Sequence, residues 1–194
     1  MKKDIKLSGV GGQGILSIAT VIAEAATEAG LRLKQAEVHG MSQRGGDVQS
    51  DLRLSTEEIF SDQISIGKAD LIISMEPMEA LRYLPYLSKD GVIVTSSKPF
   101  VNIPNYPEEA KLLAELDALP HVARLDIEQL AKDNGIPKSA NMVLLGMATR
   151  YIEIISAEQM RKAIRQIFNR KGEQVVADNI KAFELGYNYH EDIQ

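Results

Sequence analysis

The chain has 194 residues, of which 44% are apolar and 25% are charged, the composition of an ordinary soluble globular protein. Its 22 basic and 27 acidic residues leave a formal charge of −5, so no basic excess is available to neutralise nucleic-acid phosphates or an anionic membrane. The chain contains no cysteine, which excludes disulfides, zinc–thiolate sites, a catalytic cysteine and cysteine-bound iron–sulfur clusters.

The N-terminal residues give no targeting signal. Residues 1–4 lead directly into a strand-like run, and no apolar run in the chain approaches the ~20 residues that span a bilayer. We therefore expect a cytoplasmic protein without a membrane partner. The length predicts a single domain over residues 1–194, with residues 139–189 as its C-terminal helical part.

The first half of the chain predicts a mixed sheet. A short strand over 5–7 runs into a glycine-rich turn, and apolar residues at three- and four-residue spacing then predict a helix over 15–29. Strands are predicted over 31–38 and 47–54. The connection between them, 39–46, is too short for a parallel crossover, so these two strands are expected to be antiparallel neighbours or to lie apart in the sheet.

The rest of the chain alternates strands and helices and then becomes all helical. The predicted elements are, in order, a buried strand over 69–75, a helix over 77–87, a turn at Asp90-Gly91, a strand over 92–95, a loop over 99–107, a helix over 108–116, a strand over 121–126, a helix to about 134, a buried helix from 139, a helix capped by Ser156 and Gln159, and a final helix to Tyr187. The pattern predicts a three-layer α/β/α Rossmann-like domain with a mixed sheet and C-terminal helices.

A strand, Gly9-x-Gly11-x-x-Gly14 and a helix form an arrangement that binds phosphate groups. Gly9 permits the tight turn, Gly11 the close approach of an anion, and Gly14 close packing of helix and strand. The first amides of the helix lack intrahelical partners and carry the positive end of its dipole. A tight turn that binds nothing is the alternative. Gly12 and Gln13 favour a ligand, because Gly12 leaves the approach open and Gln13 can offer its amide to a ligand or partner.

The loop from Glu37 to Gly46 concentrates polar side chains and three glycines. Arg44 can present a forked cation to a phosphate or carboxylate, and His39 can titrate near neutral pH. We expect this loop to share a sheet edge with the glycine turn and to form one cleft with it. A hydrogen-bonded structural role for His39 and an ion pair for Arg44 are the alternatives. Glu37 roughly fits the position of a ribose-binding acid, or that of a carboxylate in a polar loop or subunit contact.

Two motifs together carry a family resemblance. Gly9-Val10-Gly11-Gly12-Gln13-Gly14, followed by Glu-Val-His-Gly-Met-Ser-Gln-Arg-Gly-Gly over 37–46, resembles the small, gamma-type subunit of 2-oxoacid:ferredoxin oxidoreductases. The second motif is similar to the version in the beta subunit of the indolepyruvate branch, whereas the pyruvate and 2-oxoglutarate branches usually carry Tyr-Gly-x-Glu-x-Arg-Gly-Gly. The run from Asn141 to Gly146 also resembles a helix start of that family.

The resemblance implies one subunit of an enzyme that oxidatively decarboxylates 2-oxoacids, chiefly indolepyruvate, to acyl-CoA and passes the electrons to ferredoxin. Coenzyme A would be a substrate, and a large partner subunit would hold thiamine diphosphate and iron–sulfur clusters, so this chain would be inactive alone. No metal site is expected in it, and His39 is the catalytic candidate. The residues expected to shape the cleft for coenzyme A or thiamine diphosphate are Gly9, Gly11, Gly12, Gln13, Gly14, Gln43, Arg44, Gly45 and Gly46.

Two other functions fit the same residues. The glycine motif and Glu37 are also compatible with a free-standing NAD(P)-dependent dehydrogenase, although the chain leaves little room for a substrate domain. A nucleotide-binding scaffold without a reaction of its own is the third hypothesis, since the terminal helices suit docking as well as core packing.

Overall fold

The computed structural model describes residues 1–39 and 45–189, and only the backbone of His39. One sheet has the strand order β2-β3-β1-β4-β5-β6. Its strands are β1 (Lys2–Val10), β2 (Arg32–His39), β3 (Asp47–Ser55), β4 (Ala69–Ser74), β5 (Leu87–Ser96) and β6 (Val122–Leu125). The helices are α1 (Ile15–Glu28), α2 (Pro77–Arg82), α3 (Glu109–Asp117), α4 (Ile127–Asp133), α5 (Ala140–Ile152), α6 (Ala157–Phe168) and α7 (Glu173–Tyr187).

The sheet is mixed, as predicted. Strands β1, β4, β5 and β6 run parallel to one another, whereas β3 pairs antiparallel with both β1 and β2. The antiparallel pairing of β2 with β3 confirms the inference from the short connection between them. In the strand order, β3 lies between β2 and β1.

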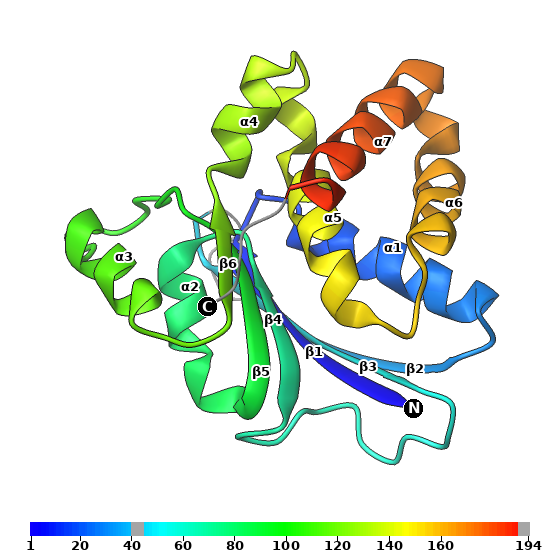
Figure 1. Cartoon of the computed structure of the whole chain (residues 1–194), viewed down its shortest axis with the longest axis horizontal. Helices are drawn as coiled ribbons and strands as arrows, with labels where there is room; N and C mark the ends of the chain where they lie inside the picture. The colour runs from blue at the N-terminus through cyan, green and yellow to red at the C-terminus, as the bar shows by residue number, and fades with distance from the viewer. Residues whose placement is uncertain (40–44, 190–194) are drawn as a thin grey trace.

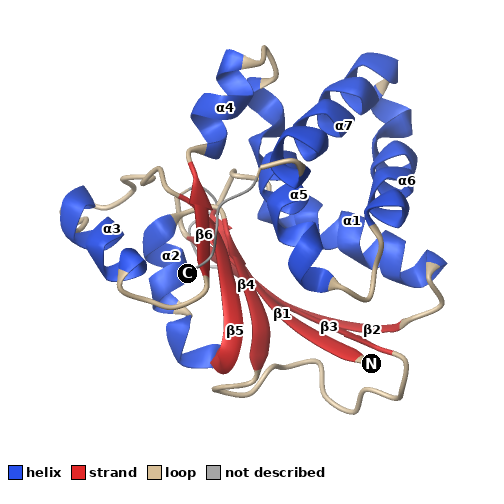
Figure 2. Ribbon diagram, viewed as in Figure 1, coloured by secondary structure: helices blue, strands red, loops and turns tan. Residues whose placement is uncertain are grey.

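Helices cover both faces of the sheet. Helices α1, α5, α6 and α7 lie on one side, and α2 and α3 lie on the other (Figures 1 and 2). The two apolar cores follow from strand alternation: Leu71 and Ile73 of β4 belong to the larger core, and Ile72 belongs to the smaller core beneath α2. The predicted α/β/α architecture with C-terminal helices is therefore confirmed.

Strand β1 buries polar and charged side chains on one of its two faces. Ile5 and Leu7 pack into the larger core, but Asp4, Lys6 and Ser8 point to the other face and are also buried. Arg53 binds both carboxylate oxygens of Asp4, at 2.8 and 3.1 Å. The same sheet face therefore carries buried charges between β1 and β3.

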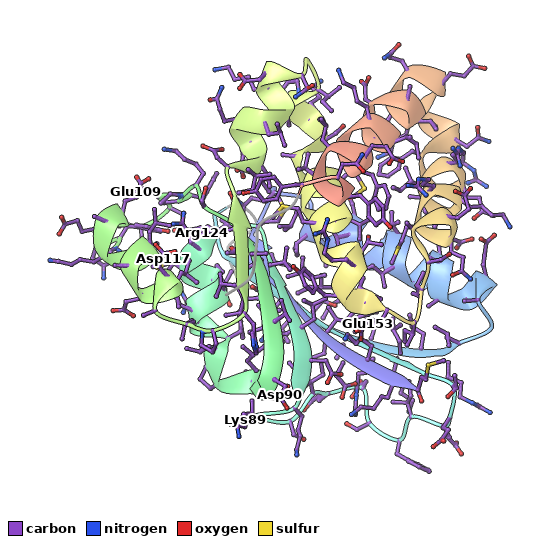
Figure 3. The ribbon with its side chains drawn as sticks, viewed as in Figure 1. Lys89, Asp90, Glu109, Asp117, Arg124 and Glu153 are labelled. Carbon is purple, nitrogen blue, oxygen red and sulfur yellow. The ribbon has the colours of Figure 1, made fainter. Side chains whose placement is uncertain are left out.

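The prediction for residues 77–92 is wrong in two places. The helix ends at Arg82, and a 3₁₀ turn over Leu84–Tyr86 leads into β5, because Pro85 removes an amide that a longer α-helix needs. The expected turn at Asp90-Gly91 lies within β5 as an irregularity, where Ala69 pairs with Leu87 but Leu71 pairs with Val92. Lys89 and Asp90 lie at the end of β5 that is remote from α4 (Figure 3).

The C-terminal helices pack closely, because glycines allow two backbones to touch. A Cβ atom on Gly146 of α5 would lie 2.1 Å from the Phe183 carbonyl oxygen, and one on Gly186 of α7 would lie 1.8 Å from that of Val143. The capping box predicted at the start of α6 is present: Ser156 and Gln159 exchange side-chain hydrogen bonds with each other's amides. Within the described residues, no helix has the length and apolar character needed to cross a bilayer.

Candidate functional site

A cavity of about 610 Å³ lies where the parallel strands end. Its wall includes Gly12–Gly14 after β1, Met75 after β4, Phe100 after β5 and Glu128 after β6. Helix α1 follows β1 on one face of the sheet and α2 follows β4 on the other, so the cavity lies at the switch point where open α/β sheets bind ligands. Residues before and in the C-terminal helices complete the wall: Pro137, Lys138, Ser139, Ala140, Asn141, Phe168, Lys171, Val175, Asp178 and Asn179.

The glycine turn depends on two left-handed backbone positions, Gly12 at φ 101° and Gly14 at φ 84°. A Cβ atom on Gly14 would lie 2.8 Å from Nδ2 of Asn141, whereas one on Gly12 would meet open space. The Asn141 side chain donates a hydrogen bond to the Gly14 carbonyl oxygen at 3.1 Å. The sequence is compatible with either a ligand contact or a helix-end hydrogen bond for Asn141, and in the structure Asn141 ties the start of α5 to the glycine turn.

Two helix N-termini border the cavity. Neither α1 nor α5 has a side-chain cap, so their first amides and dipoles are available to an anion. Lys138 and Lys171 add positive charge to the wall, opposed by Glu128 and Asp178. Burial raises the pKa of Glu128, so its carboxyl group holds its proton to higher pH than an exposed one. The glycine turn and the lysines thus form the part of the wall that suits phosphate.

Gly11 and Gln13 have partners within the chain. The Gly11 amide, expected to face an anion, donates to the Gly46 carbonyl oxygen at 2.9 Å. The Gln13 side chain accepts from the Val10 amide at 2.8 Å and donates to the Met75 carbonyl oxygen at 3.3 Å. Both groups therefore shape the turn. The Gln13 and Ser17 amides also donate within the chain, to the Val10 and Gly14 carbonyl oxygens, so the anion-binding prediction is left to the amides of Gly12, Gly14 and the first two residues of α1.

The predicted loop begins and ends at the sheet edge of the glycine turn. His39 pairs with Val48 of β3, and Val48 pairs with Gly9 of β1. Gly46 then contacts Gly11 directly, which brings the two motifs together as expected. Gln43 and Arg44 lie outside the described residues, and so does the side chain of His39.

Glu37 is not placed for a ribose. It pairs with Ser50 of β3, which in turn pairs with Leu7 of β1. In dinucleotide-binding folds the ribose acid ends the strand next to β1, but here an entire strand intervenes, which adds about 5 Å. The ribose interpretation of Glu37 is therefore wrong for this sheet order.

Glu76 has a larger structural role than its sequence position indicates. An acid between a strand and a helix is compatible with a cleft residue or with compensation of the helix dipole. The Glu76 carboxylate is completely buried and caps α2 by accepting from the Glu79 amide at 2.9 Å. It also accepts from the Phe100 amide and the Tyr106 hydroxyl. The only sequence signal was an acid directly before the helix-starting Pro77; the two partners beyond residue 99 left none.

Comparisons with known proteins agree with this geometry. The model of the pyruvate ferredoxin/flavodoxin oxidoreductase family matches residues 4–189. The indolepyruvate oxidoreductase subunit IorB of Pyrococcus horikoshii is 38% identical over 192 residues, covering 94% of this chain and 93% of that protein. The gamma subunit of the keto/oxoacid ferredoxin oxidoreductase of Geobacter sulfurreducens has a TM-score of 0.69 at 28% identity, over 95% of this chain and 96% of that one.

A larger solved protein contains the same fold. The 2-oxoglutarate:ferredoxin oxidoreductase of Magnetococcus marinus, solved with 2-oxoglutarate, coenzyme A and succinyl-CoA bound, has a TM-score of 0.75 at 23% identity. The match covers 96% of this chain but 30% of that chain, so this chain corresponds to under a third of it. At this identity the likeness establishes the fold alone.

Proposed function

We propose the function from one premise: this chain belongs to the pyruvate ferredoxin/flavodoxin oxidoreductase family. It acts as the small subunit of an indolepyruvate ferredoxin oxidoreductase. In the reaction, a 2-oxoacid loses its carboxyl group as CO₂, the acyl group joins the sulfur of coenzyme A, and the electrons pass to ferredoxin. The indolepyruvate assignment follows the relatives named as subunit IorB, at 38% and 34% identity.

The observation that carries the proposal is the cavity at the switch point of the sheet. Its volume is within the usual range of roughly 300–1,000 Å³ for ligand sites. It combines a glycine turn, two uncapped helix N-termini and two lysines, which together suit the phosphate groups of coenzyme A. The Magnetococcus protein was solved with coenzyme A bound.

The residues of this chain bind and orient in this proposal. The amides of Gly12, Gly14 and the first two residues of α1 would hold a phosphate, because the Gln13 amide already donates to Val10. Lys138 and Lys171 would neutralise the phosphate, and Met75 with Phe100 would contact the less polar part of the ligand. Arg44 is proposed as a further cation of the same site. Whether the glycine turn meets coenzyme A or thiamine diphosphate is decided by the experiment below.

A large partner subunit supplies the redox groups in this proposal. The chain has no cysteine, so it lacks the usual ligands of an iron–sulfur cluster. Thiamine diphosphate and the clusters are therefore assigned to the partner, and this chain contributes the binding surface.

The test is reconstitution. The chain alone should not turn over indolepyruvate, and addition of the large subunit should give ferredoxin reduction that requires coenzyme A. Lys138 is exposed, so Lys138→Met should raise the KM for coenzyme A roughly fivefold, the upper value for one exposed ion pair, with little change in kcat. Lys132→Met, an exposed lysine of α4 that does not line the cavity, is the matched control. An unchanged KM for coenzyme A together with a raised KM for thiamine diphosphate would assign the turn to thiamine diphosphate.

The proposal has a clear contrary result. Turnover by the isolated chain, or micromolar binding of NAD(H) in calorimetry, would indicate a free-standing enzyme instead. Full activity of Arg44→Ala in the assembled complex would remove Arg44 from the site.

A further inference from the structure

The carboxylate of Glu76 is buried at the junction of β4 and α2 and joins three neutral donors. Its Oε2 accepts from the Glu79 amide at 2.9 Å, and its Oε1 accepts from the Phe100 amide at 3.3 Å and from the Tyr106 hydroxyl. Since a buried charge is stable only when hydrogen-bonded, all three bonds support one another. One carboxylate therefore holds both the first turn of α2 and the segment 97–106.

The Tyr106 hydroxyl is held as a donor. Burial and its bond to Glu76 raise the pKa of Tyr106, so the phenol stays protonated across the physiological range. Because Phe100 and Tyr106 bind the same oxygen of Glu76, the residues between them are closed into a loop. That loop is irregular in backbone, and the carboxylate fixes its two ends.

The closed loop reaches the two motifs. Nδ2 of Asn102 donates to the Gly45 carbonyl oxygen at 2.7 Å, and the next residue, Gly46, accepts from the Gly11 amide at 2.9 Å. A continuous path of contacts thus runs from Glu76 through Asn102 to the glycine turn. Phe100, on the same loop, forms part of the cavity wall.

We propose that Glu76 is a positioning residue, and that it acts through the segment 97–106 and Asn102 to fix Gly45 and Gly46 against the glycine turn. It touches no ligand itself. Its effect is on the position of the glycine turn, which forms the phosphate-binding end of the cavity. The identification of the ligand as coenzyme A rests on the proposed function.

Two conservative variants test the path without removing the buried charge. Asn102→Ala deletes the bond to Gly45, and Tyr106→Phe deletes one bond to Glu76 while keeping the ring. In the full chain, amide exchange of the peptide over residues 9–14 should become about fivefold faster in both, the effect expected for loss of one hydrogen bond. In the assembled complex, the KM for coenzyme A should rise about fivefold, while kcat and the KM for indolepyruvate stay within about twofold.

The chain offers matched controls for both variants. Asn134→Ala removes a side-chain bond to the Leu130 carbonyl oxygen at the end of α4. Tyr86→Phe removes the hydroxyl of a ring that lies before β5 and packs against Lys6. Neither should change the exchange of residues 9–14 or the KM for coenzyme A.

The outcomes separate this inference from the proposed function. Exchange equal to that of the controls overturns the inference, as does faster exchange with an unchanged KM for coenzyme A. A parallel change in kcat and in both KM values also overturns it, since that indicates general loss of structure. If the wild-type complex shows no dependence on coenzyme A, the proposed function fails, and the exchange rates alone then decide whether the path from Glu76 to the glycine turn exists.

Discussion

Two irregular segments are each held to the sheet by buried carboxylates, but the carboxylates are stabilised in different ways. Segment 97–106 is held by Glu76, whose donors are neutral amides and a hydroxyl. Segment 56–68 is held by Asp51, which accepts from the Ile64 amide at 2.9 Å, and by Arg53, which donates to the Ser61 and Gln63 carbonyl oxygens. Asp51 is neutralised by Lys6 at 2.7 Å.

This difference determines where the fold has room for a ligand. At segment 56–68 the ion pairs leave only small cavities, of about 170 Å³ beside Lys6 and Asp51 and about 230 Å³ beside Asp4 and Arg53. At the other segment, one carboxylate with neutral donors leaves the larger cavity open beside it. Buried charge serves to order a loop in both places, and only the second arrangement leaves room for a nucleotide-sized molecule.

The largest expected effect comes from breaking the ion pair. Lys6→Met leaves the Asp51 carboxylate buried without its cation, and the free energy of unfolding should fall by about 3–5 kcal/mol. Urea denaturation measures this. The double variant Lys6→Met/Asp51→Asn removes the uncompensated charge and should recover at least half of the loss. No recovery would mean that the lost packing of Lys6 against Tyr83 and Tyr86, and not charge, accounts for the effect.

The matching change at the other segment is Glu76→Gln. An amide NH₂ must then face at least one of the donors that the carboxylate accepts from, so the free energy of unfolding should fall by about 2–3 kcal/mol, less than for Lys6→Met. Asp126→Asn is the control, since Asp126 caps α4 through the Gln129 amide alone and asparagine caps as well as aspartate. An equal effect of the two changes would show that Glu76 acts only as a helix cap.

How far the sequence predicts these two regions depends on the range of the interactions. The antiparallel pairing of β2 with β3, the glycine turn and the capping box at Ser156 were predictable, since connection length and local spacing indicate them. The place of β3 between β2 and β1 was not, because connection length leaves it open. The hydrogen bonds that Glu76 accepts from Phe100 and Tyr106 were not predictable, because those residues are 24 and 30 positions away in sequence. The predicted end of α2 lies too late in the sequence, because the apolar spacing continues past Pro85. Gly11 and Gln13 are residue types that often contact ligands. Only the fold shows that Gly11 is bound by Gly46, and that Gln13 is bound by Val10 and Met75.

A smaller effect distinguishes the two left-handed glycines of the turn. Gly12→Ala adds only the backbone cost of a positive φ, about 1–2 kcal/mol, since its Cβ atom meets open space. Gly14→Ala adds a contact at 2.8 Å with Asn141 and should lower the free energy of unfolding by about 1 kcal/mol more. Thermal unfolding of both variants, with Gly14→Ala/Asn141→Ala beside them, measures the difference. If the double variant is no more stable than Gly14→Ala, the contact with Asn141 is not the cause.

The smallest effect concerns the sign of the pH dependence at two glutamates, Glu128 in the cavity wall and Glu184 outside it. Burial raises the pKa of Glu128, so wild-type stability falls as pH rises from the unfolded pKa, about 4.3, through the folded one. Glu128→Gln should therefore become more stable than the wild type between pH 4 and pH 8, by a few tenths of a kcal/mol as an order-of-magnitude value. In α7, the bond to Arg161 lowers the pKa of Glu184, so the stabilisation is present above about pH 4.3 and is lost as pH falls through the folded pKa. Glu184→Gln should be the less stable protein at pH 7, and its deficit should shrink as the pH falls below about 4.3. Urea denaturation from pH 3 to pH 8 measures both curves, and two curves of the same sign would contradict the assignment of burial to Glu128 and of ion pairing to Glu184.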